Sequence, residues 1–563
     1  MNAELLIAHF NRISDATDAV PHLRRFILDL AVRGKLVGQD PTDEPAAKLL
    51  ERVQAEKTKR GRSERAKKAS LPSETVQDST LPTGWVWTSL ADLVTVLNGR
   101  AYSQNELLTA GTPVLRVGNL FTSQHWYYSD LELNEDKYCD VGDLIFAWSA
   151  SFGPFIWQGP RVIYHYHIWK LALHSDRDLD KIYLYWLLSQ KTQEIKDSGH
   201  GVSMIHMTKE KMEKLKLPLP PLVEQHRIVA KIDELMALCD RLEAVRAEQN
   251  NRRDRLTAAS HHHLNNGSTA DTLCNHADFF IGHLPRLTAK PGQIKQLRQT
   301  ILNLAVRGKL VPQDLSSQSA SELLKNLKDI RSQSIAARTL KQAPEINNSI
   351  SKCSGLLLPQ SWTWAKCGHI LFVTKLAGFE YTKYFSLHHE GEVPVIRAQN
   401  VKPWSIEKNN LVYIDRKTSE LLDRSALTKP CILMTFIGAG IGDVAMFSED
   451  ARWHLAPNVA KIERFEGAED LLDLSYLTIY LNSPFGREEI FKHLKSTAQP
   501  SISMGTIRDI DVALPPLREQ QRIAAKVHEL LALTNQLEAQ LDTTQTEATR
   551  LLKSVLYDTL EPI

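Results

Sequence analysis

The sequence predicts an α+β protein written twice: two globular α+β domains separated by two long antiparallel coiled-coil spacer helices, with a pseudo-two-fold internal duplication. Three observations predict this fold. Long segments return in the same order in the second half, all 11 tryptophans fall inside two segments, and each copy ends in a stretch with apolar residues seven positions apart. A chain of 563 residues is long enough for such a plan, because domains typically hold roughly 100–200 residues.

The duplication is the first element to justify. LRRFILDLAVRGKLV at 23–37 returns as LRQTILNLAVRGKLV at 297–311, with 12 of 15 positions identical. The segment LPPLVEQHRIVAKIDELMALCDRLEA at 219–244 returns at 514–539 with 17 of 26 identical positions. Between these pairs, LPTGWVW at 81–87 returns as LPQSWTW at 358–364, and LRVGN at 115–119 returns as IRAQN at 396–400. Chance does not produce this order, so the whole chain is two tandem copies.

The two middle segments predict the globular domains. They share turns and little sequence, and they mix short apolar runs such as GDLIFAW (142–148) and KPCILMTF (429–436) with Gly and Pro turns. Later in the first segment, KIYLYWLLSQKTQEIK is typical of a helix. The tryptophans lie only in these segments, which separates compact domains from a helical frame. We expect each middle segment to be an α+β domain.

The stretches after each Pro-Pro pair predict the spacer helices. Proline is tolerated at a helix start, and the apolar residues that follow recur with the spacing of a coiled-coil seam. From Leu222 to about Asn250 such a helix runs on the order of 40 Å at about 1.5 Å per residue, somewhat more than one turn of B-DNA. The residues expected along the seam are Ile228, Ile232, Leu235 and Leu242 in the first helix and Ile523, Val527, Leu530 and Leu537 in the second.

These elements give the following domain boundaries. We expect an N-terminal helical region with a basic linker, a first globular domain, a central spacer helix, a linker containing His261-His262-His263, a second copy of the N-terminal region, a second globular domain and a C-terminal spacer helix. Metal binding by the three histidines is a minor alternative to the linker. In order, the ranges are 1–80, 81–216, 217–260, 261–292, 293–357, 358–511 and 512–563.

Composition excludes several classes. The net charge is only +2, with 68 basic and 66 acidic side chains, so any nucleic-acid surface must be local. The six cysteines are far apart and form no Cys-x-x-Cys pair, which disfavours a zinc ribbon or a disulfide framework. No stretch approaches the roughly 18 apolar residues of a membrane span, and no signal-peptide pattern opens the chain. We expect a cytoplasmic protein.

The sequence also lacks the motifs of catalysis. No Asp/Asn-Pro-Pro-Tyr/Phe motif for a flipped adenine and no phosphate-binding P-loop is present. FIGAGIGD at 436–443 has the wrong spacing for a dinucleotide loop, and we interpret it as a turn. Glu135-Asp136-Lys137 contains the Glu-x-Lys of many nucleases, but this tripeptide is common by chance and is interpreted as a solvated loop. We therefore expect no catalytic residue and no metal site.

Two different globular domains on a spacer suit the recognition of two short DNA sequences separated by unread DNA. The chain resembles, over essentially its full length, the specificity subunits of Type I restriction–modification systems. The most specific features are the helix openings LPLPPLVEQHRI and LPPLREQQRI, supported by the two AVRGKLV segments. The resemblance implies that 81–216 and 358–511 are target-recognition domains and that the repeated helices space them and dock partners.

The resemblance also implies the partners. These are double-stranded DNA, two modification (methyltransferase) subunits, and restriction/translocase subunits, without a membrane. It implies no cofactor in this chain, whereas the partner subunits would use S-adenosylmethionine, ATP and magnesium to methylate adenine and to cut unmethylated DNA. The alternatives are a coiled-coil scaffold without DNA recognition, a self-contained methyltransferase or nuclease, and a specificity subunit of a methylation-only system. The missing motifs argue against catalysis in this chain.

Candidate base contacts come from matching turns of the two copies. Arg116 and Asn119 match Arg397 and Asn400, and bidentate Arg to guanine and Asn to adenine are favoured major-groove contacts. An equally weighted alternative is that Asn stabilises a turn and Arg pairs with a carboxylate.

The segments before the spacer helices, GVSMIHMTK (201–209) and PSISMGTIR (500–508), supply candidate phosphate contacts or, equally, helix N-caps. Tyr102 and Trp148 could stack on a base, although packing in the core is the favoured interpretation. The basic run at 57–68 could follow the DNA backbone or be a solvated linker. The candidate DNA contacts are Tyr102, Arg116, Asn119, Trp148, Ser203, Lys209, Arg397, Asn400, Lys402, Ser501, Ser503 and Arg508.

Overall fold

The computed structural model divides the chain into two compact units, one formed by residues 1–249 with 545–563 and one by residues 250–544. We call them unit 1 and unit 2 and describe each by itself. The structure describes residues 16, 18–61, 81–149, 152–198, 208–267, 269–313, 318–337, 356–438, 440–492, 494 and 500–557. Candidate residue Ser203, and most of the basic run at 57–68, lie outside the described residues.

Unit 1 contains the first globular domain, which we call head 1. Two four-stranded sheets with the orders β2-β9-β6-β7 and β4-β3-β8-β5 form its body, and the pair β1-β10 closes its base. All neighbours in these sheets are antiparallel except β3 and β8, which are parallel. The strands are β1 (Val86–Ser89), β2 (Val94–Asn98), β3 (Thr112–Leu115), β4 (Tyr127–Ser129), β5 (Tyr138–Cys139), β6 (Leu144–Ala147), β7 (Gly153–Ile156), β8 (Val162–Tyr164), β9 (Ile168–Leu173) and β10 (Lys216–Leu219).

Short helical segments join these strands. The longest, α6, packs its apolar side chains, including Leu184 and Leu187, into the core formed with β2, β6 and β9. The helical segments are α5 (Leu90–Leu93), η1 (Gln104–Glu106), η2 (Val117–Leu120), η3 (Glu135–Lys137), α6 (Lys181–Ser198) and α7 (Lys209–Glu213).

Unit 2 contains head 2, which repeats this topology. Its sheets have the orders β12-β21-β18-β19 and β16-β13-β20-β17, its base pair is β11-β22, and a two-stranded sheet β14-β15 is added. The parallel pair is β13 and β20. The strands are β11 (Thr363–Lys366), β12 (Phe372–Lys375), β13 (Val393–Ile396), β14 (Val401–Lys402), β15 (Ser405–Ile406), β16 (Val412–Ile414), β17 (Ala426–Leu427), β18 (Cys431–Thr435), β19 (Val444–Phe447), β20 (Trp453–Leu455), β21 (Val459–Glu463) and β22 (Asp511–Leu514).

The helical segments of head 2 follow the same order, with α16 and α17 in the place of α6. Apart from the added β14-β15 sheet, the strands of the two heads have the same order, so the predicted α+β class with internal duplication is confirmed. The segments are α13 (Cys367–Ile370), α14 (Gly378–Tyr384), η4 (Ala398–Asn400), α15 (Arg416–Leu421), η5 (Asp423–Ser425), α16 (Leu474–Asn482), α17 (Pro484–Phe491) and α18 (Met504–Arg508).

Two long helices, α8 (Leu222–Asn266) and α19 (Leu517–Tyr557), are the predicted spacers. Unit 1 combines the beginning of α8 with the end of α19, and unit 2 combines the end of α8 with the beginning of α19. The remaining helices are α3 (Ala19–Val32), α4 (Ala46–Gly61), α9 (Ala270–Gly282), α10 (Leu284–Leu287), α11 (Pro291–Val306) and α12 (Ala320–Ala336). None of the described helices has the length and apolar character of a membrane span.

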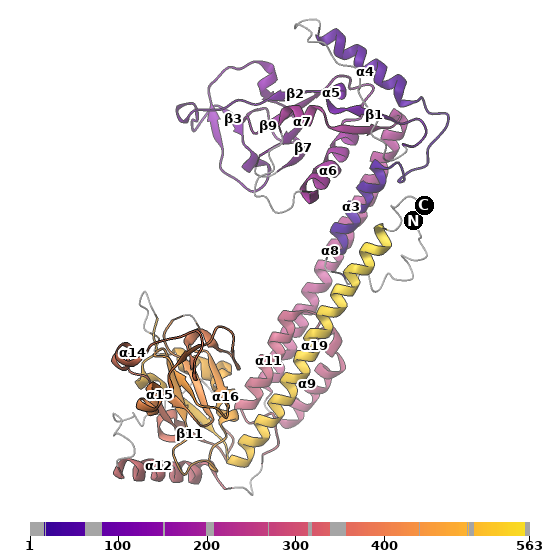
Figure 1. Cartoon of the computed structure of the whole chain (residues 1–563). Helices are drawn as coiled ribbons and strands as arrows, with labels where there is room; N and C mark the ends of the chain where they lie inside the picture. Colours follow the sequence, from indigo (N-terminus) through magenta and orange to yellow (C-terminus); the bar gives the residue numbers. More distant parts are fainter. Residues whose placement is uncertain are drawn as a thin grey trace. The chain divides into compact units, whose positions relative to one another are not determined.

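Within each unit a short repeated helix packs against the spacers. In unit 1, α3 lies along α8 (Figure 1), with the Arg24 guanidinium 2.6 Å from Asp240 and 2.7 Å from Glu243. In unit 2, the Arg298 guanidinium on α11 lies 2.6 Å from Glu538 on α19. The repeated LRRFILDL and LRQTILNL segments are therefore the α3 and α11 helices, and their arginines make equivalent ion pairs.

The predicted seam residues have partners within their own unit. Ile228 and Ile232 are buried in the core of head 1, and Ile523 and Val527 are buried in the core of head 2. Further along the helices, Leu235, Leu242 and Leu530 are partly buried against the same cores. The first turns of each spacer thus form part of a head, which the seven-residue spacing did not indicate. That Leu537 packs along the seam remains a prediction.

The structure differs from the predicted linker at 261–292. His261, His262 and His263 continue α8, which ends only at Asn266, and α9 and α10 follow directly. Leu264, Phe280 and Leu287 form a small buried cluster there. Polar composition suggested a linker, but apolar residues at helical spacing are enough to fold the segment into short packed helices. Among the described residues, no three His, Cys, Asp or Glu side chains are arranged to hold a metal ion.

Candidate nucleic-acid interface

The parallel strands β3 and β8 create the candidate site of head 1. Because the carboxyl ends of parallel strands lie at one edge of a sheet, the residues that follow them meet there. Arg116 directly follows β3 and His165 directly follows β8, and the His165 amide donates to the Leu115 carbonyl at 2.9 Å. Trp148 follows β6, and its amide donates to the His167 carbonyl at 3.1 Å. Three loops therefore converge at one edge of the head.

A recess of about 310 Å³ lies at this edge. Its lining combines one guanidinium, three imidazoles, an amide and a phenol, which are groups that hydrogen-bond or stack on nucleic-acid bases. The residues that line it are Arg116, Val117, Gly118, Asn119, Ser123, His125, Tyr127, His165 and His167.

Asn119 organises the recess through its backbone contacts. Its carboxamide oxygen accepts a hydrogen bond from the Arg116 amide at 3.1 Å, and its nitrogen donates to the His125 carbonyl at 2.8 Å. The Arg116 guanidinium lies over the Tyr127 ring, 5.2 Å from its centroid. The structure thus shows Asn119 engaged in the turn, which was the alternative interpretation, while it holds Arg116 at the rim of the recess.

Tyr102 lies beside the recess and stacks on His165, with ring centroids 6.4 Å apart. The Arg100 guanidinium lies 5.3 Å from the Tyr102 ring centroid and 2.6 Å from the Glu106 carboxylate. Burial raises the pKa of Tyr102 to about 12, so its hydroxyl stays protonated at neutral pH. The tyrosine ring thus supports His165, which lines the recess.

Trp148 is partly buried and belongs to an aromatic cluster. Its ring stacks on Trp169 with centroids 5.5 Å apart, and its indole nitrogen donates to the Tyr166 carbonyl at 2.8 Å. It also contacts His167 edge-on, at 5.1 Å between centroids. Much of the ring is therefore packing surface, and its edge supports the histidine loop of the recess.

The loop His165-Tyr166-His167, which follows Tyr164 at the end of β8, is the part of the site that sequence reasoning missed. Burial, with His167 and Arg116 nearby, lowers the pKa of His165 to about 4, so this imidazole is neutral at pH 7. A neutral imidazole both donates and accepts hydrogen bonds. The alternating Tyr-His pattern directly after an apolar run was an available signal for an aromatic loop at a strand end.

Head 2 places the matching residues at the matching edge. The Asn400 oxygen accepts from the Arg397 amide at 3.1 Å, as Asn119 accepts from Arg116. Asn400 is only 1% exposed, and Arg397 donates to the Asn410 carbonyl at 2.6 Å. The two Arg–Asn turns are thus equivalent, but the guanidinium of head 2 is partly engaged.

The loop that carries the histidines in head 1 differs in head 2. The Ala456 amide donates to the Ile396 carbonyl at 2.8 Å, which is the contact that His165 makes in head 1. Ala456-Pro457-Asn458 therefore replaces His165-Tyr166-His167. Phe436 takes the place of Trp148, with the Lys375 ammonium 5.0 Å from its ring centroid. One scaffold thus presents two chemically different surfaces.

The other candidates of head 2 have varied surroundings. Ser501 forms a β-bridge with Ile437, directly after Phe436. Ser503 caps α18, accepting from the Thr506 amide at 2.9 Å. Arg508 donates to the Val373 carbonyl at 3.0 Å, and its burial lowers its pKa. Of these, only Ser501 is brought next to the loop edge.

Two candidates remain. Lys402 ends β14, and the Lys209 ammonium in head 1 lies 3.6 Å from the Glu213 carboxylate. The Thr208 hydroxyl caps α7 as Ser503 caps α18, by accepting from the Lys211 amide at 3.3 Å. Ser503 and Thr208 are therefore helix N-caps, which is the alternative that the sequence left open for these two segments.

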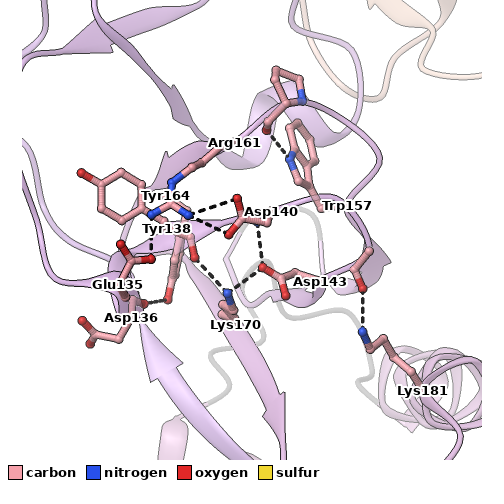
Figure 2. A network of polar contacts seen from close by, with 12 residues as sticks. Glu135, Asp136, Tyr138, Asp140, Asp143, Trp157, Arg161, Tyr164, Lys170 and Lys181 are labelled. Carbon is pink, nitrogen blue, oxygen red and sulfur yellow. Dashed lines mark hydrogen bonds and ion pairs between the residues drawn. The ribbon is translucent and has the colours of Figure 1, made fainter. Parts of the chain in front are cut away.

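A polar network in head 1 connects residues at β5 and β8 of one sheet with Lys170 on β9 of the other (Figure 2). Arg161 lies between Glu135 and Asp140, at 2.7 and 3.1 Å, and Lys170 lies 2.6 Å from Asp143. Lys170 also donates to the Tyr138 carbonyl at 3.0 Å. These charges neutralise one another where β5, β8 and β9 meet. The Glu135 carboxylate pairs with Arg161, which does not favour a nuclease-like role for the Glu135-Asp136-Lys137 tripeptide.

The glycine-rich segment at 436–443 joins the antiparallel strands β18 and β19. Gly438, Gly440 and Gly442 have positive φ, and the Gly442 amide donates to the Thr435 carbonyl at 2.8 Å. The sequence predicted a turn here, and the segment leads from one strand into its antiparallel neighbour and not into a helix.

Two heads of matching topology, each followed by a long helix, define a duplicated protein with two chemically different loop edges. The model of the Type I restriction modification DNA specificity domain matches residues 82–250 and 373–544. The chain is 28% identical over 541 residues to the EcoAI specificity subunit of Escherichia coli, covering 92% of this chain and 90% of that protein. It is 27% identical over 562 residues to the EcoEI specificity subunit of the same species, covering 93% and 91%.

The chain belongs to the Type I restriction–modification specificity family, whose function is DNA target recognition. Among solved structures, it is similar to the HsdS subunit from Thermoanaerobacter tengcongensis, with 16% identity, a TM-score of 0.40, and coverage of 85% of this chain and 97% of that one.

Proposed function

We propose that the loop edges of the two heads read two different half-sites of a bipartite DNA target. The observation that carries this proposal is the pair of equivalent Arg–Asn turns at the ends of the parallel strands, beside loops that differ between the heads. Shared turns fix a common docking position, and different neighbours give each head its own base preference.

Within head 1, Arg116 is proposed to contact a base edge, since a guanidinium fork matches guanine O6 and N7. Tyr102 and Trp148 would flank the contacted base. Asn119 would act by holding the turn, as Asn400 would beside Arg397 in head 2. Side chains of the two segments that precede the spacer helices in sequence would hold phosphates and fix the docking position. These are Ser203, Lys209, Ser501, Ser503 and Arg508, and Lys402 is proposed as a further DNA contact of head 2.

The chain is proposed to act without catalysis of its own, with two modification subunits docked on the repeated helices. Those subunits would use S-adenosylmethionine to methylate an adenine in each half-site after flipping it. Restriction/translocase subunits would use ATP and magnesium to cut unmethylated DNA. The names of the EcoAI and EcoEI relatives as subunits of restriction enzymes support this assembly. A protein acting on chromosomal and incoming DNA in this way would work in the cytoplasm.

The test is a genome-wide map of adenine methylation in cells that express this chain with its modification partner, compared with cells that express the partner alone. We expect a bipartite methylated motif only when this chain is present. An assembled, active partner that methylates no motif in the presence of this chain would favour a scaffold role. Methylation without cleavage of unmodified DNA would indicate a methylation-only system.

A further inference from the structure

The three repeated motifs meet at one buried carboxylate in each unit. In unit 1, Glu224 is 1% exposed and accepts hydrogen bonds from the Trp85 indole at 3.0 Å and from the Gln39 carboxamide at 3.1 Å. Glu224 comes from the spacer helix, Trp85 from the start of head 1, and Gln39 from the loop after α3. We call these three residues the junction of unit 1.

Unit 2 repeats the junction residue by residue. Glu519 is 0% exposed and accepts from the Trp362 indole at 3.0 Å and from the Gln313 carboxamide at 2.6 Å. The motifs LPxxW, GKLVxQD and PPLxEQ are therefore repeated in the chain because they build the same head-to-helix junction twice.

The neighbouring glutamine adds a second connection in each unit. The Gln225 oxygen accepts from the Asp180 amide at 2.9 Å, where α6 begins, and its nitrogen donates to the Pro220 carbonyl at 3.0 Å. Gln520 makes the same contacts to Asp473 at the start of α16 and to Pro515, both at 2.9 Å. Each head is thus hydrogen-bonded to its spacer helix at two separate places.

A buried carboxylate adds little to the free energy of unfolding, because the loss of its hydration offsets most of what its contacts contribute. Burial raises the pKa of Glu224, and the hydrogen bonds from Gln39 and Trp85 oppose that rise. The best-attested use of buried polar groups is to select one geometry among several. Hydrogen bonds are directional, so the junction fixes an orientation that apolar packing alone would leave less defined.

We propose that Glu224 and Glu519 are positioning residues that hold each head in one orientation on its spacer helix and thereby set the gap tolerated between the two half-sites. This inference rests on the proposed reading of a bipartite target. Loss of a junction should broaden the tolerated gap without changing the bases that either head reads.

The two junctions differ in a way that supplies a matched control. Glu224 uses both oxygens, Oε2 toward Trp85 and Oε1 toward Gln39. At Glu519, Trp362 and Gln313 both donate to the same oxygen, Oε1. In Glu224→Gln, one acceptor becomes an amide N–H that faces another donor. In Glu519→Gln, the amide oxygen can still accept both hydrogen bonds.

The experiment uses the full chain assembled with its modification partner and the half-sites mapped in the wild type. Methylation rates are measured on duplexes whose gap between half-sites is changed one base pair at a time. We expect the wild type and Glu519→Gln to prefer one gap by about tenfold or more, and Glu224→Gln to prefer it by about threefold or less, a difference of about 0.7 kcal/mol or more. Trp85→Phe, which removes the donor and leaves a smaller aromatic ring, should broaden the range of tolerated gaps in the same way.

A folded Glu224→Gln or Trp85→Phe assembly with the wild-type gap preference would overturn the proposal. So would an equal loss of rate at every gap that tracks a lower unfolding temperature, since that is the result of a purely structural role. If Glu224→Gln does not assemble, Trp85→Phe decides by the same criteria. A wild-type assembly that methylates no bipartite motif would instead refute the proposed function.

Discussion

Arg116 and Arg397 occupy equivalent positions, yet their surroundings differ. Arg116 lies over an aromatic ring at the rim of an open recess, whereas Arg397 donates a hydrogen bond to a backbone carbonyl. A guanidinium that already donates to the backbone has fewer N–H groups left for a base edge. The two arginines therefore give a matched pair for testing base recognition.

The substitution Arg116→Ala should relax the base preference at one position of the first half-site and leave the second half-site unchanged. A lost bidentate contact is worth about 1–3 kcal/mol, or roughly 5- to 150-fold in discrimination. Arg397→Ala should affect only the second half-site, and to a smaller extent. Methylation sequencing of both variants measures this, and a change in both half-sites from either substitution would contradict the assignment.

His165 gives a pH-dependent prediction. Its pKa falls from 6.5 to about 4 on folding, chiefly through burial. The unfolded chain therefore binds the proton more tightly, and the stability that the neutral ring contributes is present above pH 6.5 and is lost as the pH falls toward 4. Because the ring is only partly buried, we expect an effect on the order of 1 kcal/mol or less.

The measurement is denaturant unfolding of the wild type and of His165→Asn between pH 7 and pH 4. The free energy of unfolding of the wild type should fall more steeply than that of the variant. His261 and His369 also have pKa values lowered to about 4, and they are common to both proteins. Parallel pH profiles would show that the pKa of His165 is not lowered on folding.

Among the elements, the loop after α3 shows why a glycine is repeated. Gly34 and Gly308 have φ of 66° and 65°, a backbone region that non-glycine residues rarely adopt. A Cβ at Gly308 would lie 2.5 Å from the Pro359 ring, and one at Gly34 would overlap Pro82. The loop can therefore approach the head only through glycine.

The substitution Gly34→Ala should destabilise unit 1 by about 2 kcal/mol or more, since strain in the left-handed region costs about 1–3 kcal/mol and the contact with Pro82 adds to it. Gly38→Ala is the control, because nothing lies within 4 Å of a Cβ there, and it should change stability by about 0.5 kcal/mol or less. Unfolding followed by tryptophan fluorescence compares the two. Equal stabilities would show that the loop accommodates a side chain.

The spacer helices combine two roles along their length. Their first turns are buried in a head, as Ile228 and Ile523 show, and later turns contact the repeated helices α3 and α11. Apolar residues at seven-residue intervals correctly predicted that one face of each helix is packed against other residues. They could not identify the packing partner, because one stripe fits a second helix or the face of a domain equally well.

At the scale of the whole molecule, the duplication makes the heads exchangeable in principle. Each head has its own core, and its junction to the spacer helix uses residues repeated in both copies. Recognition should therefore be modular, with one half-site assigned to each head.

Replacing residues 81–216 with the head of a related specificity subunit should change one half-site of the methylated motif and leave the other half-site and the gap unchanged. The junction residues Gln39 and Glu224 stay in place, and the incoming head must supply the tryptophan that matches Trp85. Methylation sequencing of the chimera gives the result. A simultaneous change in both half-sites would show that the heads do not read independently.

The sequence by itself determined the duplication, the α+β class, the two long helices and the matching Arg–Asn turns, because identical segments in one chain must build equivalent local structure. The tract 261–292 shows the limit of composition: histidine and asparagine suggested a linker, while a few apolar contacts around Phe280 fold it into helices.

Only the tertiary structure decided which distant residues meet. Glu224 lies 185 residues from Gln39 and 139 from Trp85, and no periodicity relates such positions. His165 joins Arg116 because parallel strands end at the same edge, and that pairing depends on the sheet order. Local sequence specifies helices, turns and their repeats through short-range contacts, whereas a buried junction or a recess is created only when the packed sheets bring separate segments together.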